Sequence, residues 1–273
     1  KRITIQSFSV STYADTSVTY MDLEGRMDWG AQIRDAREFF LAVDPGGFVE
    51  RERAQRYTAA TMFAQYPFNS HYRVEGRAGY VQRRSTLPLF TDRGLVLREF
   101  EDDYPVASLS LVGDTTRYQG FGPYHGFRFR VGVTGYTFVS GDNEDESVTG
   151  YDWDFRFYQG LTRRSLLAVR VAGVFQNGDA TNLYTLGGLN QLRGFRFREF
   201  FGENLAYANV ELRFPLIDFL RWGFGAFTGP FRGFLFADFG SAWFEDQLYL
   251  TESGGLATGR AVWDQDLGTF RKF

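Results

Sequence analysis

Arg193 is the residue of this sequence whose chemistry is easiest to state. It lies in the segment Leu192-Arg193-Gly194-Phe195, in the middle of a long connection between two segments of alternating apolar and polar residues. Its guanidinium is a fixed cation with five N–H donors, and Gly194 can adopt backbone angles that other residues avoid. A loop that lies only in water has no need of leucine and phenylalanine at its tip. We therefore predict that this loop folds back inside a barrel whose wall the other strands form.

Other residues with reactive side chains form weaker patterns. His71 and His125 are too few and too isolated for a metal site or a catalytic triad. The acidic run at 142–146 offers oxygen ligands for Ca²⁺ but lacks the spacing of a known calcium loop, which favours a solvated loop. The Gly-Phe-Gly segment at 120–122 precedes no helical pattern, so it does not predict a dinucleotide site. We expect no metal and no cofactor.

Acidic and basic residues share the polar positions of several segments, among them Arg73, Glu75, Arg77, Asp152, Asp154 and Arg156. Pairs of carboxylates can catalyse hydrolysis. Interleaved opposite charges along a wet interior, however, need no catalytic role. We therefore predict that the protein is not an enzyme.

The composition suits strands whose two faces meet two different solvents. Of 273 residues, 44% are hydrophobic, and the mean hydropathy of −0.29 by itself suggests a soluble protein. Aromatic residues nevertheless make up 18% of the chain, and there are 31 glycines. A transmembrane β-barrel has this combination, because only every second residue faces lipid while the others face a wet lumen.

Several further features narrow the class of protein. No run of about 18 apolar residues occurs, so we predict no transmembrane helix. No leader pattern follows Lys1, so we expect any signal peptide to have been removed or to lie outside this chain. The net charge of −3 gives no reason to expect nucleic acid as a partner. The absence of cysteine is compatible with an oxidising periplasm.

Apolar and polar residues alternate along much of the chain, which is the period of a β-strand. A soluble sandwich is an alternative reading of such a pattern. Unbroken alternation over about 9 to 11 residues suits a tilted membrane strand, whereas globular strands more often have 5 or 6 residues. The pattern predicts about twelve strands, at 3–11, 17–23, 26–34, 39–43, 56–65, 71–83, 105–112, 127–134, 151–158, 167–175, 203–214 and 231–244.

The predicted connections switch between compact and extended forms. Compact turns are predicted near Asn69, Gln159 and Gly122, and long polar connections at 84–104, 140–147 and 178–202. Short turns at one end and long loops at the other are the usual layout of an outer-membrane barrel. The lengths of the connections therefore support the membrane reading.

Two ordered blocks of the sequence carry a family resemblance. The block at 184–216 contains Gly187-Gly188, the Leu-Arg-Gly-Phe tip and the run Asn-Val-Glu-Leu-Arg-Phe-Pro-Leu. The block at 232–240 reads Arg-Gly-Phe-Leu-Phe-Ala-Asp-Phe-Gly. Together they resemble the barrel of the outer-membrane assembly-factor superfamily, which includes the BamA/TamA-type insertases, the two-partner secretion transporters and the bacterial surface antigen proteins. An Asp-Thr-Thr segment at 114–116 adds weaker support.

The resemblance implies a sixteen-stranded antiparallel barrel with an inward-folded loop, here at about 177–202. In that family the loop arginine pairs with acidic residues of the inner wall, which implies that Arg193 pairs with Glu211, Asp238 or both. A guanidinium fits a carboxylate bidentately, and leaving one partner of a buried pair unpaired costs about 3–5 kcal/mol. The alternative is that Arg193 is a solvated loop arginine and Glu211 an ordinary charge of the wet face.

We expect residues 1–273 to form a single transmembrane β-barrel domain of outer-membrane type. The segment 268–273 ends in Phe273 but lacks the long alternation of a closing strand. About three strands are therefore expected to be missing at the C-terminal end or to be supplied in another way, since an open edge in lipid leaves backbone groups unsatisfied. The resemblance also leads us to expect periplasmic repeats like those of relatives, which the sequence from Lys1 onward does not include.

The resemblance implies an outer-membrane protein of a Gram-negative type of cell that inserts or translocates polypeptides through a lateral seam, without a cofactor. Its expected partners are the lipid bilayer, a polypeptide client, and a periplasmic module or partner subunits. The alternative is a passive channel or a structural barrel subunit of a larger outer-membrane complex, in which the loop is only a plug.

Overall fold

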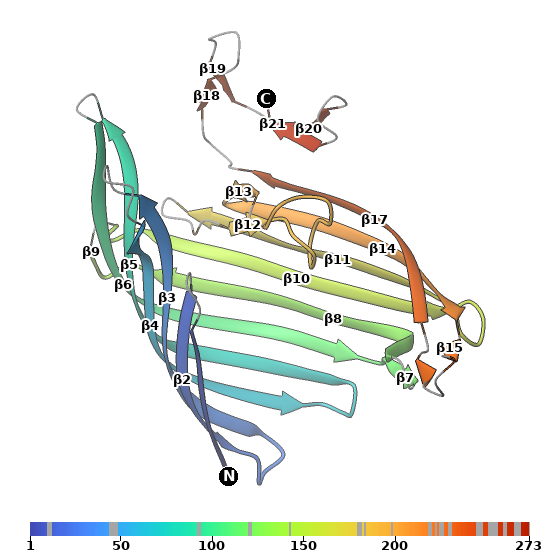
Figure 1. Cartoon of the computed structure of the whole chain (residues 1–273). Coiled ribbons are helices and arrows are strands. Elements are labelled where there is room, and N and C mark those ends of the chain that lie inside the picture. The colour runs from blue at the N-terminus through green and yellow to red at the C-terminus, as the bar shows by residue number, and fades with distance from the viewer. Residues whose placement is uncertain are drawn as a thin grey trace. The chain divides into compact units, whose positions relative to one another are not determined.

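The computed structural model shows a chain built from β-strands (Figure 1). It describes residues 1–9, 13–43, 49–91, 94–119, 122–141, 143–178, 182, 184–197, 199–217, 220–221, 223, 227–228, 231–243, 248–250, 256–258, 261–264 and 269–272. No helix in these ranges is long and apolar enough to cross a membrane. The predicted all-β fold is confirmed.

The long strands belong to one antiparallel sheet with the order β1-β2-β3-β4-β5-β6-β8-β10-β11-β14-β17. Long strands that follow one another in the chain are therefore neighbours in the sheet, as in a meander. Their bounds are β1 (Arg2–Ser9), β2 (Tyr13–Asp22), β3 (Asp28–Val43), β4 (Val49–Pro67), β5 (Tyr72–Thr91), β6 (Gly94–Asp114), β8 (Gly122–Thr137), β10 (Ser147–Gly160), β11 (Leu166–Gly178), β14 (Asn204–Ile217) and β17 (Phe231–Trp243).

The short strands lie beside this path or in small separate sheets. β7 (Arg117–Gln119) pairs with β8, and β9 (Ser140–Gly141) pairs with β6. The two-stranded sheets pair β12 (Tyr184–Leu186) with β13 (Phe200–Gly202), β15 (Leu220–Arg221) with β16 (Phe227–Thr228), β18 (Leu248–Leu250) with β19 (Leu256–Thr258), and β20 (Ala261–Asp264) with β21 (Thr269–Lys272). Phe273, which follows β21, lies outside the described residues.

By contacts between residues the chain divides into two compact units. Unit 1 contains Lys1–Leu111, Val133–Thr149 and Asn177–Ala180, and unit 2 contains Val112–Gly132, Gly150–Gln176 and Thr181–Phe273. Each unit contains a buried apolar cluster of its own. The Leu-Arg-Gly-Phe tip and the strands that it contacts all belong to unit 2.

A row of exposed apolar side chains crosses the strands of unit 1. The register places Ile5 opposite Val18, Val18 opposite Ile33, Ile33 opposite Ala60, and Ala60 opposite Tyr80. Ile5 is 72% exposed and Ile33 64% exposed. Paired neighbours on a strand face support one another in packing, but here that packing leaves a continuous apolar row uncovered. Such a row suits an apolar solvent rather than water.

The two faces of β11, β14 and β17 in unit 2 differ in the same way. On one face Leu167, Leu212 and Leu235 lie in a row, and Leu235 is 64% exposed. On the other face, which we call the loop face because the loop between β12 and β13 lies on it, the register forms the rows Ala168-Glu211-Phe236, Arg170-Asn209-Asp238 and Ala172-Tyr207-Gly240. Alternation along each strand thus separates an apolar face from a polar one.

The buried cluster of unit 1 surrounds an ion pair between neighbouring strands. Arg83 of β5 donates through Nη2 to Asp102 Oδ2 of β6 at 2.7 Å, and only 2% of the Asp102 side chain is exposed. The Arg83 guanidinium lies 5.3 Å from the ring centre of Phe138. The other Asp102 oxygen accepts from the backbone N–H of Asn143 at 3.2 Å and from its Nδ2 at 2.9 Å. We call Arg83 and Asp102 the Arg83 pair.

Two of the predicted connections are wrong. The sequence predicts a long polar loop at 84–104, but residues 84–91 continue β5 and residues 94–104 begin β6. Residues 49–55, also predicted as loop, begin β4. The short turns near Asn69 and after Gln159 are found: the backbone N–H of Phe68 donates to the carbonyl of Tyr72, and that of Leu161 to the carbonyl of Ser165. Residues 120, 121 and 142, which belong to predicted motifs, lie outside the described residues.

Candidate functional site

The predicted inward loop begins and ends at a buried polar network. Gln176 is 2% exposed and Asn204 is fully buried. The Asn204 side chain accepts from the backbone N–H of Gln176 at 2.7 Å. Gln176 Nε2 donates to the carbonyls of Asn182 and Glu203 at 2.7 and 2.8 Å. One side chain therefore holds both ends of the loop together, at the place where β11 leaves the sheet and β14 enters it.

Figure 1 shows the loop between β12 and β13 over β11 and β14. Gly188 and Leu192 form an isolated antiparallel bridge, and the backbone N–H of Gln191 donates to the carbonyl of Gly188. The Gln191 side chain accepts from the backbone N–H of Gly187 at 3.1 Å. These local bonds fix a tight turn just before the tip. Residues 179–181, 183 and 198 of the predicted loop lie outside the described residues.

Leu192 anchors the tip in an apolar cluster on the loop face. It is 3% exposed and belongs to the buried cluster of Ala172, Val174, Leu186, Leu192, Leu205 and Tyr207. Gly240 of β17 makes room for it, because a Cβ atom at Gly240 would lie 3.1 Å from Leu192 Cδ2 and 2.9 Å from Tyr207 Cβ. Burying a leucine side chain contributes about 1.5–3 kcal/mol. The loop is therefore packed against the wall at Leu192.

Arg193 joins two acidic side chains of neighbouring strands. Its Nε and backbone N–H donate to Asp238 Oδ2 at 2.7 and 2.9 Å, and its Nη2 donates to Asp238 Oδ1 at 2.5 Å. Its Nη1 donates to Glu211 Oε1 at 2.5 Å. We call Arg193, Glu211 and Asp238 the Arg193 clamp. Its side chains are 12%, 18% and 4% exposed.

The register explains why one guanidinium can reach both acids. Asp238 lies opposite Asn209, and Glu211 lies opposite Phe236, so the two carboxylates are diagonal neighbours on β14 and β17. Diagonal neighbours on paired strands lie about 7–8 Å apart. The N–H donors of one planar guanidinium can bridge the gap between their side chains. The guanidinium lies over the ring of Phe236, 4.0 Å from its centre, and gains a cation–π interaction.

The charge on Arg193 is fixed. The hydrogen bond to Asp238 raises the pKa of the Arg193 guanidinium, the bond to Glu211 raises it further, and burial opposes both. An arginine is already protonated throughout the physiological range. Changes of pH within that range therefore leave the charge of Arg193 unchanged.

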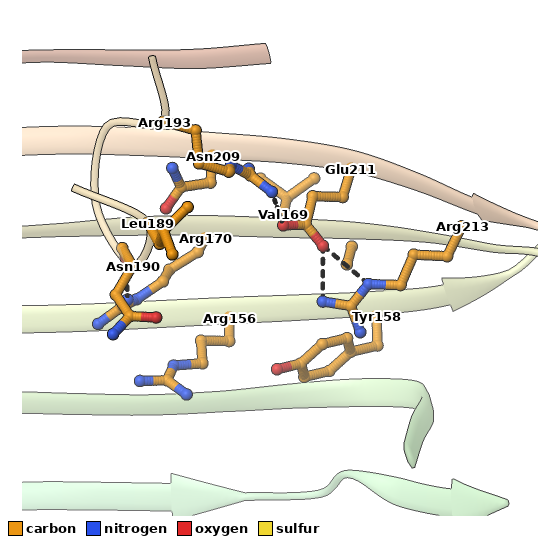
Figure 2. Close-up of a pocket in the computed structure, with 11 residues that line it drawn as sticks. Arg156, Tyr158, Val169, Arg170, Leu189, Asn190, Arg193, Asn209, Glu211 and Arg213 are labelled. Carbon is orange, nitrogen blue, oxygen red and sulfur yellow. Dashed lines mark hydrogen bonds and ion pairs between the residues drawn. The ribbon is translucent and has the colours of Figure 1, made fainter. Parts of the chain in front are cut away.

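Each acid of the clamp has a second partner on the strands. Glu211 Oε2 accepts from Arg213 Nε at 2.8 Å, two residues along β14. Asp238 Oδ1 accepts from Asn209 Nδ2 at 2.8 Å. Figure 2 shows Glu211 between the guanidinium groups of Arg193 and Arg213. The acids therefore keep hydrogen-bond donors from the wall in addition to the loop arginine.

Two further side chains hold the loop through its backbone. Asn209 Nδ2 donates to the carbonyl of Gln191 at 2.6 Å, and Arg170 Nη1 donates to the carbonyl of Asn190 at 3.3 Å. Arg170 also binds both oxygens of Asp154, with Nη2 2.8 Å from Oδ2. Arg170 and Asn209 were not among the residues predicted from the sequence. Both occupy polar positions in segments where polar and apolar residues alternate, and this alternation is the signal that could have identified them.

The other tip residues have separate roles. Gly194 has a φ of 94°, which favours glycine, and nothing lies within 4 Å of the position where a Cβ would be. Phe195 packs edge-on against Phe200, with ring centres 5.0 Å apart. The structure thus brings Leu192 and Arg193 into contact with the wall, and turns the chain at Gly194. The described residues contain no cluster of three or more His, Cys, Asp or Glu side chains that could hold a metal ion.

The model of the Omp85 superfamily domain matches residues 50–261, which is more than half of the chain. This chain belongs to the Omp85 superfamily. The family predicted from the Leu-Arg-Gly-Phe block and from the Arg-Gly-Phe-Leu-Phe-Ala-Asp-Phe-Gly block is therefore confirmed.

The Omp85 domain is similar in fold to a solved outer-membrane barrel protein, BamA from Haemophilus ducreyi lacking POTRA domains 1-3. The two share 13% sequence identity with a TM-score of 0.67, and the match covers 88% of this chain and 52% of that chain. The chain therefore spans about half the length of the structure that it matches. At this identity the likeness shows the fold, and it confirms the predicted antiparallel outer-membrane type of barrel architecture. No curated protein matches the chain in sequence.

Proposed function

We propose that this Omp85 domain lies in the outer membrane of a Gram-negative type of cell and helps polypeptides to insert into or cross that membrane, without a cofactor and without catalysing a reaction. Membership of the Omp85 superfamily supports the proposal. The exposed apolar rows on β1–β5 and on β11, β14 and β17 support a lipid-facing surface. Residues 1–273 then belong to a single barrel domain.

The observation that carries the proposal is the Arg193 clamp. An insertase must keep its lumen filled until a client arrives, because an unfilled barrel leaks ions. One cation of the loop binds two acids of the wall, and each acid also accepts a hydrogen bond from the wall itself. The loop can therefore leave the wall without leaving a carboxylate that has no hydrogen-bond donor. We therefore assign the clamp the role of setting the conformation of the barrel.

The entry point for a client is expected at the edge of the sheet. In the order of the described strands β1 stands at one end. An edge strand offers backbone N–H and C=O groups on which another strand can form, and this β-augmentation needs no side-chain recognition. We expect the client to add its strands at a lateral seam that includes β1, next to a bilayer that the barrel locally thins.

The function can be tested by reconstituting the full-length protein in lipid vesicles with a urea-denatured outer-membrane barrel as client. The fraction of client in its heat-resistant, fast-migrating form on a gel reports folding with time. We expect faster folding than in empty vesicles. Arg193→Ala is expected to change the rate, whereas Arg130→Gln, which alters an exposed pair with Asp152, is expected to leave it unchanged.

The rival function is a passive channel or a structural subunit in which the loop is only a plug. Recordings of the same protein in planar bilayers separate the two. Large, steady, ion-selective currents with no effect on client folding would reject the insertase. A closed barrel that accelerates folding would reject the channel.

A further inference from the structure

A cavity of about 200 Å³ lies beside the Arg193 clamp, between the loop and the loop face of the wall (Figure 2). It has room for several water molecules. β10, β11, β14 and the loop line it. Four of the lining residues are arginines, and the lining carboxylate is that of Glu211: Arg156, Arg170, Arg193, Arg213 and Glu211.

The acids that pair with these arginines do not balance their charge. Asp154 binds both Arg156 and Arg170, with Nη2 atoms at 2.7 and 2.8 Å. Glu211 is shared between Arg193 and Arg213, and Asp238 binds Arg193. The cluster therefore holds four guanidinium groups against three carboxylates. Like charges gathered at a partly enclosed site repel one another more strongly than in bulk water, so this arrangement favours the entry of an anion.

The shape of the cluster indicates which kind of anion fits. Each guanidinium carries five N–H donors in a plane, and Asp154 occupies the Nε and Nη2 donors of both Arg156 and Arg170. The arginines come from β10, β11, β14 and the loop, and all four line the cavity. An oxyanion with several oxygens, such as a phosphate group, can accept from several of them at once.

We propose that this cavity binds a phosphate-type oxyanion, and that the bound anion contacts both the loop and the wall. Arg156 and Arg213 hold the anion from the strands, and Arg170, which also binds the carbonyl of Asn190, holds it next to the loop. Asn190 and Leu189 of the loop close the cavity on the other side. The anion is either a free phosphate or the headgroup of a phospholipid that reaches the cavity.

Binding at this site would be linked to the position of the loop. The complete cavity exists only while the loop lies on the wall, since Leu189, Asn190 and Arg193 form part of its lining. A ligand that binds one of two conformations shifts the equilibrium toward that conformation. The oxyanion therefore stabilises the docked loop. The proposal concerns the docked state alone and does not depend on the client-folding activity.

The first test is isothermal titration of inorganic phosphate into the full chain in a neutral maltoside detergent. We expect saturable binding that Arg156→Gln weakens at least ten-fold, and Arg213→Gln serves as a second variant should the first fail to fold. Arg130→Gln is the matched control, because it removes the same charge from an exposed pair outside the cavity. A loss of the same size in the control would show a general charge effect and overturn the site.

The second test follows the loop. The chain has no cysteine, so a single Leu192→Cys variant, at a residue that is 3% exposed in the docked loop, reports release of the loop by its rate of maleimide labelling. We expect inorganic phosphate or dihexanoyl phosphatidic acid, each below any micelle concentration, to slow labelling several-fold. Protection by the lipid alone would identify a lipid headgroup as the ligand. Protection by both compounds would identify free phosphate as the ligand. Absence of protection by either would overturn the proposal.

Discussion

Two largely buried arginines of this chain use the same chemistry for different purposes. In unit 1 Arg83 is 13% exposed and lies over the ring of Phe138. In unit 2 Arg193 is 12% exposed and lies over the ring of Phe236. Both face carboxylates that are almost completely buried, Asp102 at 2% and Asp238 at 4%. Burial, charge and aromatic contact therefore do not distinguish the two sites.

The difference lies in which segments the two arginines connect. Arg83 and Asp102 belong to β5 and β6, neighbours in the sheet, so the Arg83 pair separates only when the sheet itself opens. Arg193 belongs to a loop, and Glu211 and Asp238 belong to strands that pair with each other. The loop can therefore leave while the strands stay paired. We therefore propose that the Arg83 pair holds two strands of the sheet together, whereas the Arg193 clamp holds a loop reversibly on the wall.

The largest effect is expected from Asp102→Ala, which removes the carboxylate facing the Arg83 guanidinium and the acceptor of Asn143. We expect the free energy of unfolding to fall by about 3–5 kcal/mol, measured by urea unfolding in lipid vesicles with tryptophan fluorescence. The matched control is Glu101→Ala, the adjacent acid in an exposed pair with Arg84, for which we expect about 0–1 kcal/mol. Equal losses of unfolding free energy in the two variants would show that the Arg83 pair has no special structural role.

The next effect is expected from Arg193→Ala, which should release the loop and leave the sheet intact. In a Leu192→Cys background the buried tip reports undocking through its labelling rate. Hydrogen bonds to charged groups are worth about 1.5–3 kcal/mol, so labelling should rise about 10- to 100-fold. Arg196→Ala, an exposed arginine of the same loop, is the control. A large loss of unfolding free energy without faster labelling would show that the Arg193 clamp stabilises the fold, as the Arg83 pair does, and does not control the position of the loop.

A smaller effect is expected from Gly240→Val, which disturbs the apolar cluster around the loop tip and leaves the charges of the Arg193 clamp in place. A side chain at this position would press on Tyr207, a member of the apolar cluster that receives the tip, and overpacking costs about 1–3 kcal/mol. Labelling in the Leu192→Cys background should rise accordingly. Gly76→Val is the control, because nothing lies within 4 Å of its Cβ position. An unchanged labelling rate would show that the ionic contacts alone hold the loop.

The smallest effect is expected from Gly194→Ala. The φ of 94° is costly for alanine, and the space around the position is open, so the cost is conformational and amounts to about 1–2 kcal/mol. Gly194→Asn should be milder, because asparagine tolerates positive φ better. The labelling rate in the Leu192→Cys background again provides the measurement. Equal effects of alanine and asparagine would place the cause in side-chain contacts rather than in the backbone.

The loop face could be predicted because its strands meet two different environments. Alternation placed Glu211 on the polar face of its segment and Asp238 on the face of Phe234 and Phe236, and the structure has both on the loop face. Periodicity alone does not pair a loop residue with a strand, so the contact of Arg193 with these acids was expected from the family resemblance. Arg170 and Asn209 required the register between strands, which a single sequence does not contain.

The Arg83 pair was not predicted, because Asp102 falls in a stretch that does not alternate. β5 and β6 have 20 and 21 residues, which at about 3.3 Å per residue exceed the roughly 30 Å of a hydrocarbon core even when tilted. Beyond that core both faces of a strand can be wet, and the period of two disappears although the backbone still pairs. The described residues of the stretch 84–104 therefore have the composition of a loop and the structure of strands.

The central claim is that Arg193 holds the loop through Asp238, and a double-mutant cycle tests it most directly. Arg193→Gln and Asp238→Asn are made singly and together in the Leu192→Cys background, and the labelling rate of the introduced thiol is measured for each. The account predicts that the two changes are coupled by more than about 1.5 kcal/mol, so that the second change adds little to the first. Effects that add to within about 0.5 kcal/mol would contradict it.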